Sequence, residues 1–269
     1  MAEGYVSRDA AKTYTLGPTV LGLGRAASRA EPLIGALGPW AVRVHRDTGF
    51  RCAVAAVEGD HIVVLDEAPS TGEVGRRILY APPVGVTHSA WRANAKIDRW
   101  LDRRPEVLGE TGLARLAEVV AEARRQGRLV DRLDVDLLDP LAELLRPGSP
   151  AEVLARMAAE LSPEVRRAIE QVVYPMADRK YLAAEVRPGG SYPVSIVSAP
   201  VYGPGGDPAA IMMVMVRSVL SFDQLIDVTA HLLAATRRAT ADLDGRDPWR
   251  QPGWAPWVPA VLREVCGSQ

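Results

Sequence analysis

Cysteine is scarce in this sequence, and long apolar runs are missing. Only two cysteines, Cys52 and Cys266, occur among 269 residues, too few for a disulfide framework or a cysteine-based zinc site. No apolar run approaches the roughly 18 residues that span a bilayer. The N-terminus also lacks the basic stretch and apolar core of a signal peptide. We therefore expect a cytoplasmic protein with no membrane partner.

An excess of positive charge is missing as well. The chain has 32 Lys+Arg against 33 Asp+Glu, a formal net charge of -1, and only three of its basic residues are lysines. No run of five basic residues occurs. Because affinity for DNA comes largely from basic residues that neutralise phosphates, we expect that residues 1–269 do not bind duplex DNA specifically.

Arrangements typical of catalytic or metal sites are also lacking. None of the four histidines, at positions 45, 61, 88 and 231, stands at metal-ligand spacing from another histidine or from a cysteine. His88 and Ser89 are adjacent, but neighbouring side chains rarely face each other, and no Gly-x-Ser-x-Gly elbow is present. Cys52 lies in an apolar run, which is typical of a buried, inert thiol. We expect no catalytic residue, no metal and no cofactor.

The remaining composition is that of a globular chain, with 48% hydrophobic and 24% charged residues. Apolar spacing predicts a short hairpin up to residue 16, a helix after Gly17-Pro18 and another from residue 31. Further strands are expected at 52–57, 61–65, 76–80, 181–186, 193–202 and 209–217, and further helices at 96–101, 111–126, 150–161, 162–173 and 222–243. Hairpins at both ends with helices between them predict an α+β fold with one antiparallel sheet.

Several motifs resemble those of IclR-type transcriptional regulators. The segments Gly4-Tyr5-Val6-x-Arg8 and Tyr14-x-Leu16-Gly17-Pro18 resemble the family's β-wing and the start of its linker helix. The remaining similarity lies at 52–66, which resembles the first hairpin of the effector domain, at 75–85, which resembles its effector loop, and at 195–202 with 209–211, which resemble its closing strands.

The resemblance implies a GAF-like antiparallel sheet and three parts of the chain. Residues 1–30 would be a wing remnant with the linker helix, and 31–245 an effector-binding domain with a helical insertion at about 100–175. Residues 246–269 would form a tail rich in Trp and Pro. The DNA-reading helices of the family's winged helix-turn-helix are absent from this chain, so DNA would be a partner only with such a unit upstream.

The resemblance also implies a site for a small-molecule effector. Ile196 stands where the family typically has cysteine, Met212 and Val214 where it often has serines, and Val86 where it has lysine. Residues two apart in a strand share a face, so we expect one cavity that is lined by Val84, Gly85, Ile196, Ser198, Met212 and Val214. Its ligand would be largely apolar and uncharged, or charged only at one end held by loop amides. The alternative is that these side chains fill a dry core.

The function predicted from this resemblance is an IclR-like regulator that senses an effector and controls transcription through the geometry of a homodimer or homotetramer. The alternative is a stand-alone small-molecule-binding or scaffold domain without DNA binding, and an enzyme comes third. The tail from Trp249 to Val258 carries three indoles in ten residues. We expect it to dock on a protein surface, since it would otherwise expose an apolar patch; a disordered Pro-rich tail is the other possibility.

Overall fold

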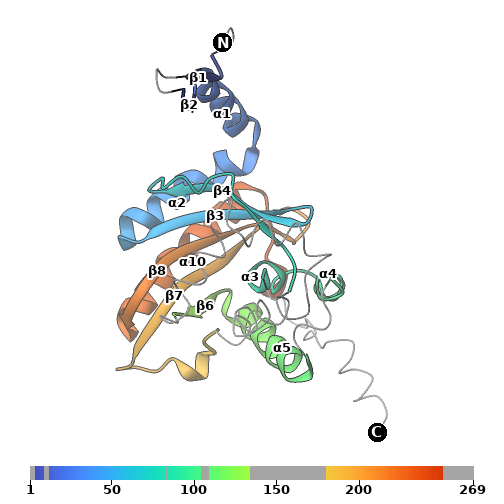
Figure 1. Cartoon of the computed structure of the whole chain (residues 1–269). Coiled ribbons are helices and arrows are strands. Elements are labelled where there is room, and N and C mark those ends of the chain that lie inside the picture. Colours follow the sequence, from blue (N-terminus) through green and yellow to red (C-terminus); the bar gives the residue numbers. More distant parts are fainter. Residues whose placement is uncertain (1–3, 9–11, 83, 104–108, 134–179, 251–269) are drawn as a thin grey trace.

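A six-stranded antiparallel sheet forms the centre of the computed structural model, which describes residues 4–8, 12–82, 84–103, 109–133 and 180–250 (Figure 1). The strands follow one another across the sheet in the order β5-β4-β3-β8-β7-β6. Their bounds are Arg51–Glu58 (β3), His61–Ala68 (β4), Arg77–Leu79 (β5), Leu129–Arg132 (β6), Ser191–Tyr202 (β7) and Pro208–Ser221 (β8). The expected α+β fold with a single main antiparallel sheet is confirmed.

Helices cover both faces of this sheet. On one face lie α2 (Pro32–Thr48) and α10 (Phe222–Asp242), and the Trp40 indole of α2 donates a 2.7 Å hydrogen bond to Asp242 of α10. On the other face lie α3 (Val86–Ser89), α4 (Asn94–Leu101) and α5 (Gly109–Gln126) (Figure 1). The sheet therefore separates two hydrophobic cores.

Neighbouring residues of the central strands belong to different cores, because successive side chains of a strand point to opposite faces. Met212 and Val214 are fully buried in the core under α2 and α10, together with Val197 and Ala199 of β7. Ile211 lies in the core beside α3–α5, which also contains most of the largest aromatic side chains: Tyr80, Trp91, Trp100 and Tyr202.

The N-terminal hairpin and helix lie beyond one end of the sheet (Figure 1). Strand β1 (Val6–Arg8) pairs with β2 (Tyr14–Leu16), and α1 (Thr19–Ala30) follows. Gly17 donates a 2.8 Å hydrogen bond to the Tyr5 carbonyl, which ties the start of the helix to the hairpin. The hairpin and the helix predicted after Gly17-Pro18 are both confirmed.

One predicted strand is wrong, and α3, β6 and the 3-10 turns were not predicted. Residues 181–186 form no strand: Lys180 makes an isolated bridge with Asp131, and a 3-10 turn, η4 (Ala183–Glu185), follows. The short elements α3 and β6 were missed because neither is long enough to show a period in the sequence. The helices predicted at 150–161 and 162–173 lie outside the described residues. In the part of the chain that the structure describes, no helix has the length and apolar character needed to cross a membrane.

Candidate functional site

The six residues predicted to share one cavity are divided by the sheet. In an antiparallel pair, residues directly opposite each other lie on the same face. Ser198 is opposite Met213, whereas Met212 is opposite Ala199. Ser198 and Ile196 therefore face α3–α5, while Met212 and Val214 face α2 and α10. The expectation that these four line one cavity together is wrong.

A register shift explains this error. Tyr202 pairs with Pro208, but Val201 pairs with Ala210, so β8 contributes one extra residue at this point. Such a bulge shifts every later pairing by one position, which moves side chains to the opposite face. Without it, Ser198 would lie opposite Met212, and the two side chains would share a face.

Val84 and Gly85 lie beside the face that holds Ser198, at the start of α3. Gly85 has φ +103°, and a Cβ at this position would lie 2.5 Å from Cδ2 of Tyr80. The Trp100 indole donates a 3.3 Å hydrogen bond to the Val84 carbonyl, and the Tyr80 hydroxyl lies 2.8 Å from Oγ of Ser89. Two aromatic side chains thus fix the loop and the first turn of α3.

His88 projects from α3 toward the sheet and is the most unusual polar residue on this face. It is buried, and neither ring nitrogen has a hydrogen-bond partner among the described residues. Its pKa is lowered to about 3, because burial disfavours the charged ring and the positive charges of Arg92 and Lys180 disfavour it further. At neutral pH the ring is therefore uncharged, with one donor and one acceptor unused.

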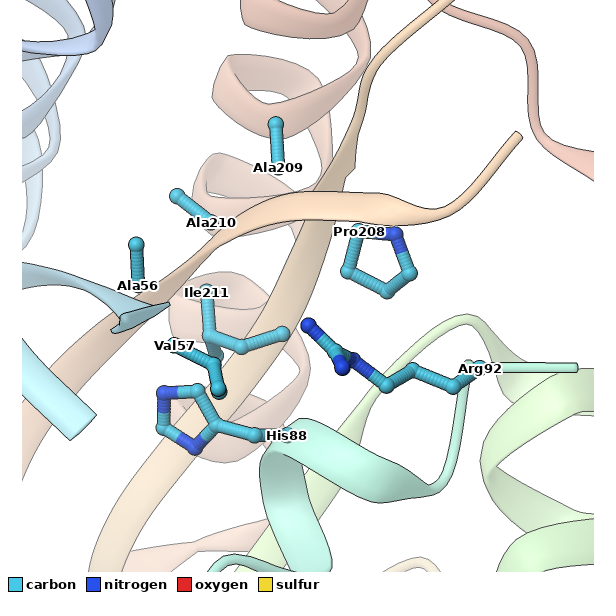
Figure 2. Close-up of a pocket in the computed structure, with 8 residues that line it drawn as sticks. All are labelled: Ala56, Val57, His88, Arg92, Pro208, Ala209, Ala210 and Ile211. Atoms are coloured by element: carbon cyan, nitrogen blue, oxygen red, sulfur yellow. The ribbon is translucent and has the colours of Figure 1, made fainter. Parts of the chain in front are cut away.

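A small hollow lies where His88 meets the sheet. Figure 2 shows the His88 ring and the Arg92 guanidinium reaching toward Ile211 at the start of β8. The space between its walls is about 170 Å³ when the solvent at its mouth is counted, and about 10 Å³ of it, roughly the room of one water molecule, is open to a water-sized molecule. The hollow is lined by Ala56, Val57, His88, Arg92, Pro208, Ala209, Ala210 and Ile211. Six of these residues are apolar, and the polar side chains are those of His88 and Arg92.

Further polar atoms on this side of the sheet lack partners. Oγ of Ser198 is buried and makes no hydrogen bond within the described residues, and the same holds for Nε of Arg92. Arg92 forms no ion pair with any carboxylate in the described segments. Buried polar atoms are nearly always satisfied by protein, water or a ligand. Three such side chains, of His88, Arg92 and Ser198, lie on this side of the sheet.

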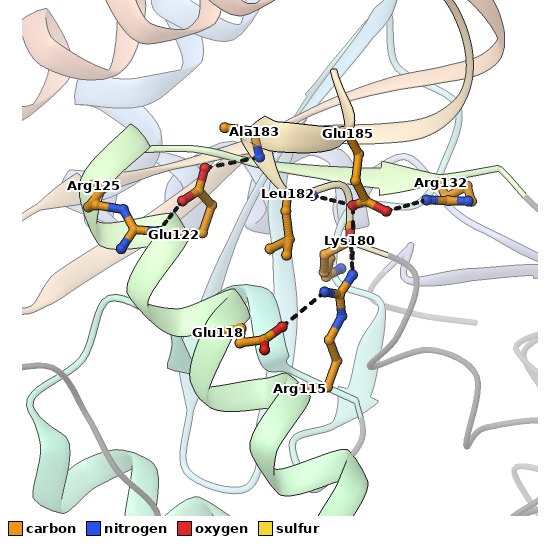
Figure 3. A network of polar contacts seen from close by, with 9 residues as sticks. All are labelled: Arg115, Glu118, Glu122, Arg125, Arg132, Lys180, Leu182, Ala183 and Glu185. Atoms are coloured by element: carbon orange, nitrogen blue, oxygen red, sulfur yellow. Dashed lines mark hydrogen bonds and ion pairs between the residues drawn. The ribbon is translucent and has the colours of Figure 1, made fainter. Parts of the chain in front are cut away.

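Lys180 lies beside β6, at the edge of the region around α3. It is buried, pairs with Asp131 and lies 3.4 Å from Oγ1 of Thr87 in α3. A polar network holds it there: Arg115 of α5 donates to the Lys180 carbonyl at 3.2 Å, and Glu122 of α5 accepts from the Ala183 amide at 3.0 Å (Figure 3).

Sequence reasoning missed His88, Arg92 and Lys180 as candidate site residues. His88 stands in α3 and Arg92 in the turn after it, so their four-residue spacing in the sequence is not the pairing of one helix face and gave no signal. Lys180 gave a weak signal, as one of only three lysines in the chain.

The arrangement does not form a nucleophile and base pair. Oγ of Ser89 bonds to Tyr80, and the His88 ring has no bond to it. Cys52 is buried, and burial, with the charge of Asp66, raises the pKa of its thiol to about 12. Among the described residues, no group of three or more His, Cys, Asp or Glu side chains is placed to hold a metal ion. What the site offers is hydrogen bonding and one positive charge in apolar surroundings.

Comparison with solved structures finds the same fold. An IclR transcriptional regulator from Alicyclobacillus acidocaldarius is 16% identical, with 90% of this chain and 80% of that chain covered and a TM-score of 0.56. The IclR of Thermotoga maritima is 14% identical, with the same coverage and a TM-score of 0.56. An IclR homolog from Microbacterium hydrocarbonoxydans, solved in complex with 4-hydroxybenzoate, is 15% identical over 89% of this chain and 80% of that chain, with a TM-score of 0.50.

Sequence comparison gives no such match: neither a protein-family model nor a curated protein matches this sequence. The likeness is thus one of structure, and it extends over most of the chain. It confirms the resemblance expected from the wing, loop and closing-strand motifs, including the predicted sheet architecture. The chain has the fold of the IclR-type transcriptional regulators.

Proposed function

We propose that this chain senses a small-molecule effector for an IclR-like transcriptional regulator, and that the effector binds between the sheet and α3. The observation that carries this proposal is His88, a buried, neutral imidazole with two unpartnered ring nitrogens beside a hollow. Small-molecule sites typically combine apolar walls with a few placed polar groups. The complex of the Microbacterium homolog with 4-hydroxybenzoate supports a small-molecule ligand.

The chemistry of the hollow favours a small ligand with an apolar body and one negative end. Arg92 supplies a positive charge without a carboxylate partner, and His88 can donate or accept one hydrogen bond. Val57 and Ile211 supply apolar walls. None of the six residues predicted from sequence lines the hollow, although Val84, Gly85, Ile196 and Ser198 lie on the same side of the sheet as His88.

We further propose that the regulator acts as a homodimer or homotetramer, with residues 1–30 as wing and linker, 31–245 as the sensing domain and 246–269 as a tail. The exposed apolar side chains of the N-terminal part support a contact with a second copy: Leu16 is 78% exposed, Leu21 67% and Leu23 55%. An effector that prefers one arrangement of the copies would shift their equilibrium by its difference in affinity.

Calorimetric titration of the purified chain tests the proposal. The panel contains benzoate and 4-hydroxybenzoate, short aliphatic carboxylates and the uncharged amides of the same acids. We expect at least one carboxylate to bind and its amide to bind at least about tenfold more weakly, since the amide cannot form a charge-assisted bond with Arg92.

Variants then locate the site. Arg92→Gln and His88→Leu should each weaken binding by at least about tenfold, because each removes a hydrogen bond to a desolvated ligand. Met212→Leu is the matched control, since it changes the same sheet on its opposite face and keeps the side-chain volume. Binding that survives both site substitutions, or is lost in the control alone, would place the ligand elsewhere. No binding by any ligand of the panel, and no molecule retained in native mass spectrometry, would contradict the sensing role.

A further inference from the structure

Trp249, near the end of the described chain, docks beside the candidate site. It lies in the short turn η5 (Pro248–Arg250), and its indole donates a 2.9 Å hydrogen bond to the Trp91 carbonyl, two residues after α3. The Arg124 guanidinium of α5 lies 3.7 Å from the centre of the indole ring. The docking expected for the tail is thus confirmed at Trp249, while Trp254 and Trp257 lie outside the described residues.

Arg124 connects this indole to the backbone that follows His88. Its side chain donates to the Ala90 carbonyl at 2.9 Å, to the Arg92 carbonyl at 2.7 Å and to Oδ1 of Asn94 at 2.9 Å. One buried guanidinium therefore holds the turn 90–94, which carries Arg92 into the hollow. Burial lowers the pKa of Arg124 to about 10, so the group keeps its charge at neutral pH.

The residues before Trp249 are also attached to the sheet domain. The Gly245 amide donates to the Thr240 carbonyl at 2.8 Å, and the Arg246 amide donates to the Gly203 carbonyl at 3.3 Å. Asp247 accepts a 2.9 Å bond from the Trp249 amide. We call residues 244–250 the C-terminal strap. It leads from the end of α10, past the β7–β8 loop, to the turn after α3.

We propose that Trp249 is a positioning residue of the candidate site: the docked strap holds Arg124 against the turn 90–94 and so fixes where Arg92 and His88 stand. Trp249 closes the outer face of the Arg124 guanidinium, so that its bonds to three backbone and side-chain oxygens form away from water. Cation–π contacts and hydrogen bonds are stronger where water is excluded. Undocking of the strap would loosen the turn and change the hollow without a contact between Trp249 and the ligand.

Amide hydrogen exchange of the full chain, without ligand, tests this positioning role. Trp249→Ala should accelerate exchange of peptides covering residues 86–94 by about tenfold, while β7 and α10 stay unchanged, because local opening follows local contacts. Trp249→Phe keeps an aromatic ring over Arg124 but removes the indole donor, so it should give a smaller acceleration in the same peptides. Since it is the milder change, it also serves where the alanine variant is too unstable to measure.

Trp40→Ala is the matched control. The Trp40 indole also bonds to a single acceptor, Asp242, but it lies between α2 and α10 on the opposite face. Its loss should accelerate exchange in α2 and α10 and leave 86–94 unchanged. If neither Trp249 variant affects residues 86–94, or if both accelerate exchange equally throughout the chain, the strap does not position the turn.

The candidate site takes its role from the proposed function, but the sensing role and the positioning role of Trp249 can be contradicted independently. If a carboxylate such as benzoate binds the unaltered chain, Trp249→Ala should weaken that binding by about tenfold while Trp40→Ala leaves it unchanged. If no ligand of the panel binds and native mass spectrometry finds no retained molecule, the sensing role is contradicted, whereas the exchange of residues 86–94 still decides the role of Trp249.

Discussion

Gly85 lies against the ring of Tyr80 so closely that the two positions constrain each other. A Cβ at Gly85 would come within 2.5 Å of Cδ2 and 2.7 Å of Cε2 of Tyr80, and the glycine itself has φ +103°. Tyr80 cannot easily withdraw, because its hydroxyl is bonded to Ser89 of α3. The loop that begins α3 can therefore accept no side chain at this point.

Gly85→Ala should accordingly destabilise the protein more than the loss of a positive-φ glycine alone. Gly72→Ala is the control, because Gly72 has φ +89° and a Cβ there would meet nothing within 4 Å. We expect about 1 kcal/mol of lost stability for Gly72→Ala from backbone strain and about 1–3 kcal/mol more for Gly85→Ala from the clash. Urea unfolding measures both, and equal losses would show that Tyr80 gives way.

The lowered pKa of His88 predicts a loss of stability in mild acid. Between about pH 6.5 and about pH 3 the unfolded chain binds a proton at His88 that the folded chain does not. The free energy of unfolding therefore decreases as the pH falls through this window, by roughly 1 kcal/mol per pH unit. His88→Leu removes this contribution, so its stability should decline less steeply below pH 6.5. Parallel curves of unfolding free energy against pH for the two proteins would contradict the buried, neutral ring.

The lowered pKa of Glu67, near the end of β4, predicts a second dependence of stability on pH. Burial alone would raise the pKa of this carboxyl, but bonds from Thr71 and from the Glu73 amide, with the charge of Arg51, outweigh burial and lower it. A lowered pKa means that the stabilisation is present above about pH 4.3 and is lost as the pH falls through the folded value.

Glu67→Gln should therefore cost about 1–3 kcal/mol at pH 7, and its difference from the unaltered protein should narrow at acidic pH. Glu58→Gln is the control, because Glu58 is about half exposed and its ion pair with Arg77 spans 3.4 Å. Such surface pairs contribute at most about 1 kcal/mol. Thermal or urea unfolding at pH 7 and pH 3.5 separates the two variants. A loss of stability for Glu67→Gln that does not depend on pH would contradict a lowered pKa of Glu67.

The Cys52 thiol should be unreactive in the folded protein. It is fully buried, and its pKa is raised to about 12, so almost no thiolate exists at neutral pH. In a Cys266→Ser variant, 5,5′-dithiobis(2-nitrobenzoate) should label Cys52 only as fast as the protein unfolds, and immediately in denaturing urea. Rapid labelling without denaturant would show that β3 opens locally.

Most of the fold was predictable because its long elements have clear periods. The strands of the β3–β4 hairpin, the strands β7 and β8, and the helices α2, α5 and α10 each show apolar spacing over several residues. The site was less predictable. The bulge at Val201 and Tyr202 cannot be recognised from the local apolar pattern, although it decides whether Ser198 lies on the same face as Met212. His88 stands in a single helical turn, and nothing short of the folded sheet shows that its ring nitrogens are buried without partners.

The pairing of β3 with β8, and of α2 with α10, constrains the order in which the chain can fold during its synthesis. The β3–β4 hairpin can form as soon as residue 68 has left the ribosome, since its two strands are joined by a tight turn. The central pair β3–β8 joins residues 51–55 to 211–215, and α2 then packs against a helix that ends at Asp242. The larger core therefore closes only after the chain has been made up to Asp242, and the apolar face of the first hairpin stays uncovered until then. Such long-range closure slows folding and exposes the nascent chain to aggregation, which makes the early hairpin a natural contact for chaperones.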